Sequence, residues 1–77
     1  MESSKPTTTE TKFFHPKRGN WKIEVSGEPK KAYINAYGVV PGHVKKDIEK
    51  IKFSGMVYTF QYLEWIARLL TGKEDAR

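Results

Sequence analysis

The segment from about residue 57 to residue 71 constrains the fold most, because almost its whole circumference would be apolar in a helix. Its polar residues recur at helical spacing and form one narrow stripe, made of Gln61, Glu64, Arg68 and Thr71. Gly72 follows, in a position that favours the end of a helix. A helix on one side of a sheet needs an apolar stripe of only roughly 100°. Two surfaces must therefore cover this helix.

The first covering surface is a sheet of the same chain, and we expect the second to be the same helix of another copy in a two-fold dimer. The predicted interface residues are Tyr62, Trp65, Ile66 and Leu69. The alternative is a monomer in which N-terminal strands and loops wrap the helix. A chain of 77 residues has little left for wrapping, which favours the homodimer.

Strand-like runs precede the helix at residues 12–15, 21–26 and 31–40, all rich in aromatic and β-branched residues. Turn signals at 16–20 and 27–29 separate them, and such short connections predict an antiparallel meander. Residues 41–50 are ambiguous, since Val44, Ile48 and Ile51 have helical spacing whereas Ile51 and Phe53 alternate with lysines. We favour a basic loop over 41–49, with at most one helical turn, and a fourth strand over 50–54. The expected fold is α+β, with a four-stranded antiparallel meander followed by one C-terminal amphipathic helix.

The ends of the chain differ in composition from the middle. Residues 1–11 are rich in Ser and Thr and predict a disordered polar tail, 12–72 a single nucleic-acid-binding domain, and 73–77 a charged C-terminal tail. The absence of cysteine and of a long apolar run predicts a protein of the cytoplasm, nucleoid or nucleus that is neither secreted nor bound to a membrane.

The alternation within the strands predicts two different sheet faces. One face is apolar, with Trp21, Ile23, Val25, Ala32, Ile34, Ala36, Ile51 and Phe53. The other is basic and aromatic, with Lys22, Glu24, Tyr33, Asn35, Tyr37, Lys50 and Lys52. Bases stack on aromatic rings and lysines neutralise phosphates, which is how proteins hold single strands. Tyr and Lys are also ordinary residues on the solvent side of a sheet. The agreement of three strands favours the functional interpretation.

The charge distribution points to the same partner. Ten bases and four acids lie between residues 12 and 52, so this segment has a net charge of +6. A positive field of this kind attracts polyanions. The predicted nucleic-acid-binding residues are Lys17, Arg18, Lys22, Lys30, Lys31, Tyr33, Asn35, Tyr37, Lys45, Lys46, Lys50 and Lys52. The sequence thus predicts a protein that binds single-stranded nucleic acid, DNA or RNA, with low sequence specificity. The competing hypothesis is a small regulatory module that binds an acidic protein partner.

Motifs for catalysis are missing from the sequence. It contains no cysteine nucleophile, G-x-S-x-G elbow, glycine-rich phosphate loop or H-E-x-x-H metal site. His15 and His43 fall in expected turns, and Asp47 with Glu49 balances nearby lysines. We therefore predict a protein that is not an enzyme and has no cofactor or metal ion.

In the order and kind of its segments the chain resembles the single-stranded-DNA-binding transcriptional coactivators of the positive cofactor four family. The matching features are the Ser/Thr tail 1–11, the meander 12–40, the basic loop 41–49, the strand Lys50-Ile51-Lys52-Phe53-Ser54, and the helix with Tyr62-Leu63-Glu64-Trp65-Ile66. The family's lysine-glycine step and Pro-Glu-Glu helix start are replaced by Ser54-Gly55-Met56-Val57-Tyr58-Thr59. The resemblance implies dimerisation through the helix and binding of unpaired strands by a concave sheet face. It implies a role in transcription, or in replication or recombination as in phage and bacterial relatives.

Overall fold

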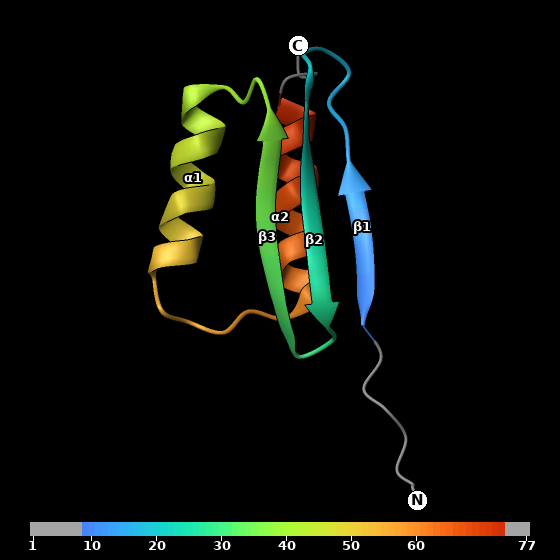
Figure 1. The fold of residues 1–77 in the computed structure, drawn as a ribbon, viewed down its shortest axis with the longest axis vertical. Coiled ribbons are helices and arrows are strands. Elements are labelled where there is room, and N and C mark those ends of the chain that lie inside the picture. The colour runs from blue at the N-terminus through green and yellow to red at the C-terminus, as the bar shows by residue number, and fades with distance from the viewer. Residues whose placement is uncertain (1–8, 74–77) are drawn as a thin grey trace, which may run out of the picture.

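The computed structural model describes residues 9–73 and has the α+β fold class that the sequence predicts. Its elements are β1 (Glu10–Phe14), β2 (Trp21–Glu28), β3 (Lys31–Gly38), α1 (Gly42–Phe53) and α2 (Phe60–Lys73). The strands form one antiparallel sheet in the order β1-β2-β3. Figure 1 shows α2 lying behind the sheet and α1 standing beside β3. One broad face of the sheet is thus left without a helix in the described part of the chain.

The predicted alternation of β2 and β3 is confirmed. Trp21, Ile23 and Val25 are buried, while the residues between them are half-buried. In β3 the buried residues are Ala32 and Ile34, which pair with Gly27 and Val25 of β2 in the antiparallel register. Side chains of directly opposed residues share one face of a sheet. The apolar side chains of both strands therefore meet on the side where α2 packs.

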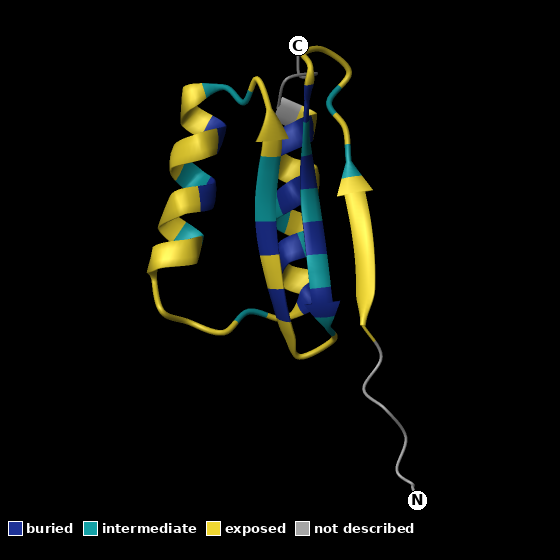
Figure 2. Cartoon of the chain, in the orientation of Figure 1, coloured by how far each residue is buried: buried dark blue, intermediate teal, exposed yellow. Residues whose placement is uncertain are grey.

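The core is assembled from four elements (Figure 2). Its buried members are Trp21, Ile23, Val25, Ala32, Ile34, Val44, Ile48, Phe60, Leu63, Ala67 and Leu70. Ile23, Val25, Val44, Leu63 and Ala67 have no exposed surface. Deleting methylene groups at such sites leaves a cavity and typically costs about 2–5 kcal/mol for Leu→Ala. This one core therefore holds the sheet and both helices together.

The predicted loop over 41–49 and the predicted strand over 50–54 are wrong, because residues 42–53 form α1. Val44 and Ile48 are buried and Ile51 is half-buried, so the helical spacing is the one that reaches the core. Phe53, expected on the apolar face, is 82% exposed. The chain accordingly has three strands and two helices rather than four strands and one helix.

The predicted C-terminal helix exists, with different ends. It begins at Phe60 rather than near residue 57. Thr59 is its N-cap residue, because the Thr59 side-chain oxygen accepts a hydrogen bond from the Tyr62 amide at 3.1 Å. It continues through Gly72 to Lys73, so Gly72 does not end it. Thr71, expected in the polar stripe, is buried and donates its hydroxyl to the Ala67 carbonyl at 2.8 Å. That bond satisfies the hydroxyl inside the core.

Backbone hydrogen bonds fix the start of α2 against the turn between β2 and β3. The Phe60 amide donates to the Pro29 carbonyl at 2.9 Å, and the Ala32 amide donates to the Tyr58 carbonyl at 3.0 Å. These bonds orient α2 so that Leu63 and Ala67 face the sheet.

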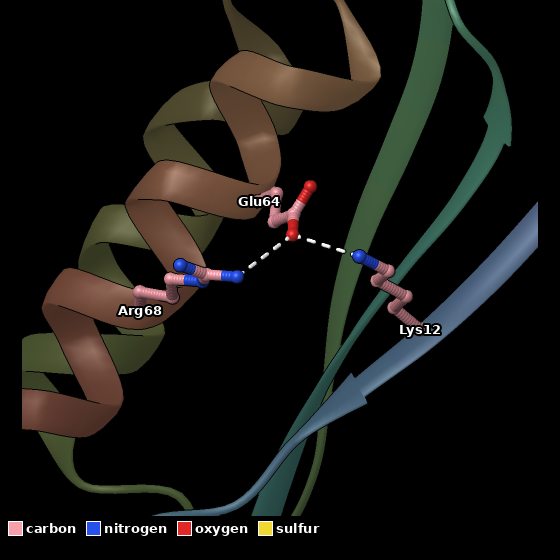
Figure 3. A network of polar contacts seen from close by, with 3 residues as sticks. All are labelled: Lys12, Glu64 and Arg68. Atoms are coloured by element: carbon pink, nitrogen blue, oxygen red, sulfur yellow. Dashed lines mark hydrogen bonds and ion pairs between the residues drawn. The ribbon is translucent and has the colours of Figure 1, made fainter.

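The first strand is attached to α2 by an ion-pair network (Figure 3). Lys12 Nζ lies 2.9 Å from Glu64 Oε2, and Arg68 contacts the same oxygen at 3.1 Å. These bonds lower the pKa of Glu64, with the hydrogen bond from Lys12 as the largest cause. β1 begins at Glu10, two residues before the predicted domain boundary. The remainder of the predicted tails, residues 1–8 and 74–77, lies outside the described residues.

Candidate nucleic-acid interface

The sheet face opposite α2 presents three exposed rings. Phe13 is 49% exposed, Tyr33 57% and Tyr37 45%. The strand register aligns the side chains in rows across the sheet: Thr11, Ser26 and Tyr33 form one row, Phe13, Glu24 and Asn35 the next, and Lys22 with Tyr37 the third. We call this surface, made of Phe13, Lys22, Glu24, Lys31, Tyr33, Asn35 and Tyr37, the open face. No other segment crosses it within residues 9–73 (Figure 1).

Polar contacts connect the second and third rows of the open face and join the second row to α1. Lys22 Nζ lies 4.7 Å from the centroid of the Phe13 ring, a cation–π distance. The Tyr37 hydroxyl donates to Glu24 Oε1 at 2.8 Å, and this hydrogen bond raises the pKa of Tyr37. The hydroxyl therefore remains a donor at neutral pH. Lys52 of α1 donates from Nζ to Asn35 Oδ1 at 2.7 Å, so α1 contributes a charge to the edge of this face.

Two grooves border the open face. The first, of about 400 Å³, lies at the Tyr37 end and is also lined by Lys22 and by His15 and Pro16 of the β1–β2 loop. The second, of about 340 Å³, follows the outer edge of β3 at the Tyr33 end and is also lined by Lys31, Lys52, Met56 and Val57. A chain that crossed the open face would thus find a concave surface at each end.

The loop at the first groove has a tightly constrained backbone. Gly19 has a φ of +96°, which L side chains rarely adopt, and a Cβ atom there would lie 2.6 Å from Nε1 of Trp21. This glycine allows the loop to fold against the buried Trp21. It thereby sets the course of the segment that contains the predicted site residues Lys17 and Arg18.

The structure divides the predicted basic residues among several surfaces. Lys22 and Lys31 lie in strands at opposite ends of the β2–β3 pair, and Lys30 lies in the β2–β3 turn beside Lys31. Lys45 and Lys52 line a groove of about 320 Å³ between α1 and the end of β3, together with Glu49. Lys50 instead lines a groove between α1 and α2, and Lys46 is exposed on α1. The expectation that Lys50 and Lys52 share one sheet face is therefore wrong, because the helix turns them to different sides.

Phe13 was not among the predicted site residues. Its neighbour Phe14 packs against the core, and consecutive strand residues point to opposite faces. Phe13 must then lie on the open face, where its partner across the sheet is Glu24. The adjacent pair of phenylalanines was the signal available in the sequence.

A second aromatic surface runs from Tyr58, just before α2, along α2. Tyr58 stacks on Tyr62 with ring centroids 5.3 Å apart, and Tyr62 is tilted against Trp65 at 5.7 Å. Tyr62 is 42% exposed, Trp65 54% and Leu69 46%, while Ile66 is half-buried. We call Tyr58, Tyr62, Trp65 and Leu69 the α2 strip. It borders a groove of about 290 Å³ lined by Asp47, Lys50, Ile51, Trp65, Ile66, Leu69 and Leu70.

Residues 9–73 contain no group of three or more His, Cys, Asp or Glu side chains that could hold a metal ion. No helix among them has the length and apolar character needed to cross a membrane. Comparison of the chain with protein-family models, curated proteins and solved structures found no match.

Proposed function

We propose that this protein binds single-stranded nucleic acid, DNA in particular, through the open face and has low overall sequence specificity. The observation behind this proposal is the set of three exposed rings on one uncovered sheet face, each next to a lysine or a polar group. Stacking on an aromatic ring is available to every base, and it contributes about 1–3 kcal/mol per base. Rings in this arrangement hold a strand whatever its sequence.

The spacing of the rings suits successive nucleotides. Tyr33 and Tyr37 are four residues apart in β3, which corresponds to about 13 Å along a strand. Phe13 lies two strands away, opposite Glu24 and in the row between the tyrosines. Lys22, Lys31 and Lys52 lie around these rings and supply the positive charge for phosphates. Processes that expose unpaired strands, namely transcription, replication and recombination, are where such a protein would act.

We further propose that the protein works as a two-fold homodimer through the α2 strip. Trp65 lies between Tyr62 and Leu69 on the helix, so an antiparallel copy would place Tyr62 opposite Leu69 and Trp65 near the axis. Large aromatic side chains bury about 150–250 Å² each, and a stable interface needs about 800 Å² per partner. The strip supplies the apolar centre of such an interface, since Tyr62 is 42% exposed, Trp65 54% and Leu69 46%. The two open faces would then point away from each other.

Fluorescence anisotropy tests the binding proposal. The full chain is titrated into labelled single-stranded DNA, single-stranded RNA and duplex DNA of equal length, at several salt concentrations. We expect unpaired strands to bind at least as tightly as duplex, with an affinity that falls steeply with salt. Absence of binding to all three would overturn the proposal and favour the acidic-protein partner. A control with poly-glutamate separates general attraction to polyanions from binding of bases.

A further inference from the structure

An acidic residue lies in the middle of the open face, where it opposes the binding of phosphates. Glu24 belongs to the central strand, with Phe13 directly opposite on β1 and Asn35 directly opposite on β3. A carboxylate at this position repels a polyanion unless it contacts something other than phosphate. Along a DNA strand, which lacks the 2′-hydroxyl of RNA, only the N–H donors of the bases suit a carboxylate. Glu24 therefore points to a contact with a base.

Asn35 offers the complementary group beside it. A lysine ammonium group can only donate, so the amide atom 2.7 Å from Lys52 Nζ must be the oxygen Oδ1. The amide nitrogen Nδ2 is turned away from Lys52, and within residues 9–73 no hydrogen bond engages it. The open face thus presents an unused donor on Asn35 next to the acceptors of Glu24. Directly opposite side chains on paired strands have Cβ atoms about 4.5–5.5 Å apart, close to the width of a base edge.

We propose that Glu24 and Asn35 select guanine at one position of the bound strand. The pairing edge of guanine has two adjacent donors, N1–H and the N2 amino group, followed by the acceptor O6. Both donors suit the two oxygens of the Glu24 carboxylate, and O6 suits the Asn35 amide N–H. Adenine and cytosine have one exocyclic amino group next to a ring acceptor. Thymine has a second acceptor where guanine has its amino group. Neither pattern satisfies a bidentate carboxylate.

The existing contacts hold these two groups in place. The Tyr37 hydroxyl donates to Glu24 Oε1 at 2.8 Å, which leaves Oε2 and a further lone pair of Oε1 available. Lys52 fixes the orientation of the Asn35 amide in the same way. Stacking of a base on Tyr33 or Tyr37 would bring its edge toward the row of Phe13, Glu24 and Asn35. Guanine selection therefore adds to the general binding of the proposed function and rests on it.

The test compares strands that differ in one base. The full chain is titrated into a thymidine oligonucleotide of about 15 nucleotides, with thymine, adenine, inosine or guanine at the centre. We expect guanine to bind about tenfold more tightly than adenine or thymine, which is the discrimination expected of one bidentate contact. Inosine lacks the N2 amino group and should lie between them.

Variants identify the residue responsible. Glu24→Gln should abolish the preference for guanine and tighten binding of the plain thymidine strand, since it removes a negative charge that repels phosphates. Glu28→Gln is the matched control, because Glu28 lies on the same face of β2, four residues further along. It should retain the preference. Glu24→Asp keeps the charge, shortens the side chain by one methylene and should also abolish the preference. It provides the same test if Glu24→Gln fails to fold.

The outcomes distinguish the two proposals. Equal affinity of the native protein for all four strands overturns guanine selection and leaves the general binding proposal intact. Retention of the guanine preference in folded Glu24→Gln overturns the role of Glu24. No binding to any strand overturns the proposed function and the selection of guanine with it.

Discussion

The open face and the α2 strip both expose aromatic rings, but the neighbours of those rings differ. On the open face Phe13 lies under the Lys22 ammonium group and Tyr37 is hydrogen-bonded to Glu24. In the α2 strip Tyr58, Tyr62 and Trp65 contact one another, with centroid separations of 5.3 and 5.7 Å. Rings interspersed with charges suit a hydrated polyanion, whereas contiguous rings suit a dry contact with protein. The surroundings of a ring indicate its partner better than its exposure does.

The largest effect is expected from a charge placed in the α2 strip. Trp65→Lys would bury an unpaired ammonium group at the centre of the dimer and should raise its dissociation constant at least about 100-fold. Phe13→Lys is the matched control, because Phe13 is 49% exposed and Trp65 54%. Sedimentation or light scattering should show a dimer for the native chain and the control, and a monomer for Trp65→Lys. A native chain that is monomeric at all concentrations would contradict the dimer.

Removal of a ring from the open face should weaken strand binding without changing assembly. Tyr33→Ala or Tyr37→Ala should each cost about 1–3 kcal/mol of binding free energy, with little change in salt dependence. Tyr62→Ala is the comparison variant, since Tyr62 is 42% exposed and Tyr37 45%. It should leave intrinsic strand affinity unchanged. Anisotropy titrations measure all three, and circular dichroism verifies that each variant folds. Equal losses for Tyr37→Ala and Tyr62→Ala would remove the distinction between the two surfaces.

The sequence predicted the central strands well because only one pattern fits them. From Trp21 to Val25 and from Ala32 to Ala36, apolar and polar residues alternate, so one choice of face follows. Residues 41–53 fit two patterns, since Ile51 belongs both to the helical series with Val44 and Ile48 and to the alternating pair with Phe53. The structure follows the helical series, in which Ile51 is joined by Val44 and Ile48, and both of these residues are buried. The burial of Val44 and Ile48 therefore favours the helix over the strand.

The candidate site was predictable only where it lies in strands. Tyr33, Asn35 and Tyr37 could be assigned to one face by alternation alone. Lys50 and Lys52 would share a face in a strand, but in α1 they are separated by about 200° of rotation. Their different locations follow from the packing of α1, which local pattern does not determine. The contact of Lys52 with Asn35 joins residues 17 positions apart and depends on the same packing.

The different locations of Lys50 and Lys52 can be tested through the salt dependence of strand binding. Lys52→Ala removes a charge beside the open face and should lower the magnitude of the slope of log affinity against log salt by about 0.7 for a single strand. Lys50→Ala removes the same charge from the groove between α1 and α2 and should leave the slope unchanged. The pair is matched in residue type and helix, and both lysines lie in the last turn of α1. Equal changes for both variants would indicate diffuse attraction to α1 rather than a contact at the open face.

The smallest effect concerns the ion pair that fixes β1, the strand of Phe13, to α2. The hydrogen bond from Lys12 is the largest cause of the lowered pKa of Glu64, whose ordinary value is 4.5. A carboxyl group with a lower pKa in the folded state stabilises the fold above its unfolded pKa, and this contribution is lost as the pH falls through the folded pKa. Thermal unfolding followed from neutral pH to about pH 3 should therefore show a loss of stability below about pH 4.5 that is smaller in Glu64→Gln. Lys12→Ala should reduce the same loss, since it removes the main cause of the shift. Parallel curves for the native chain and both variants would mean that the ion pair does not hold β1, and that pairing with β2 and the packing of Phe14 hold it instead.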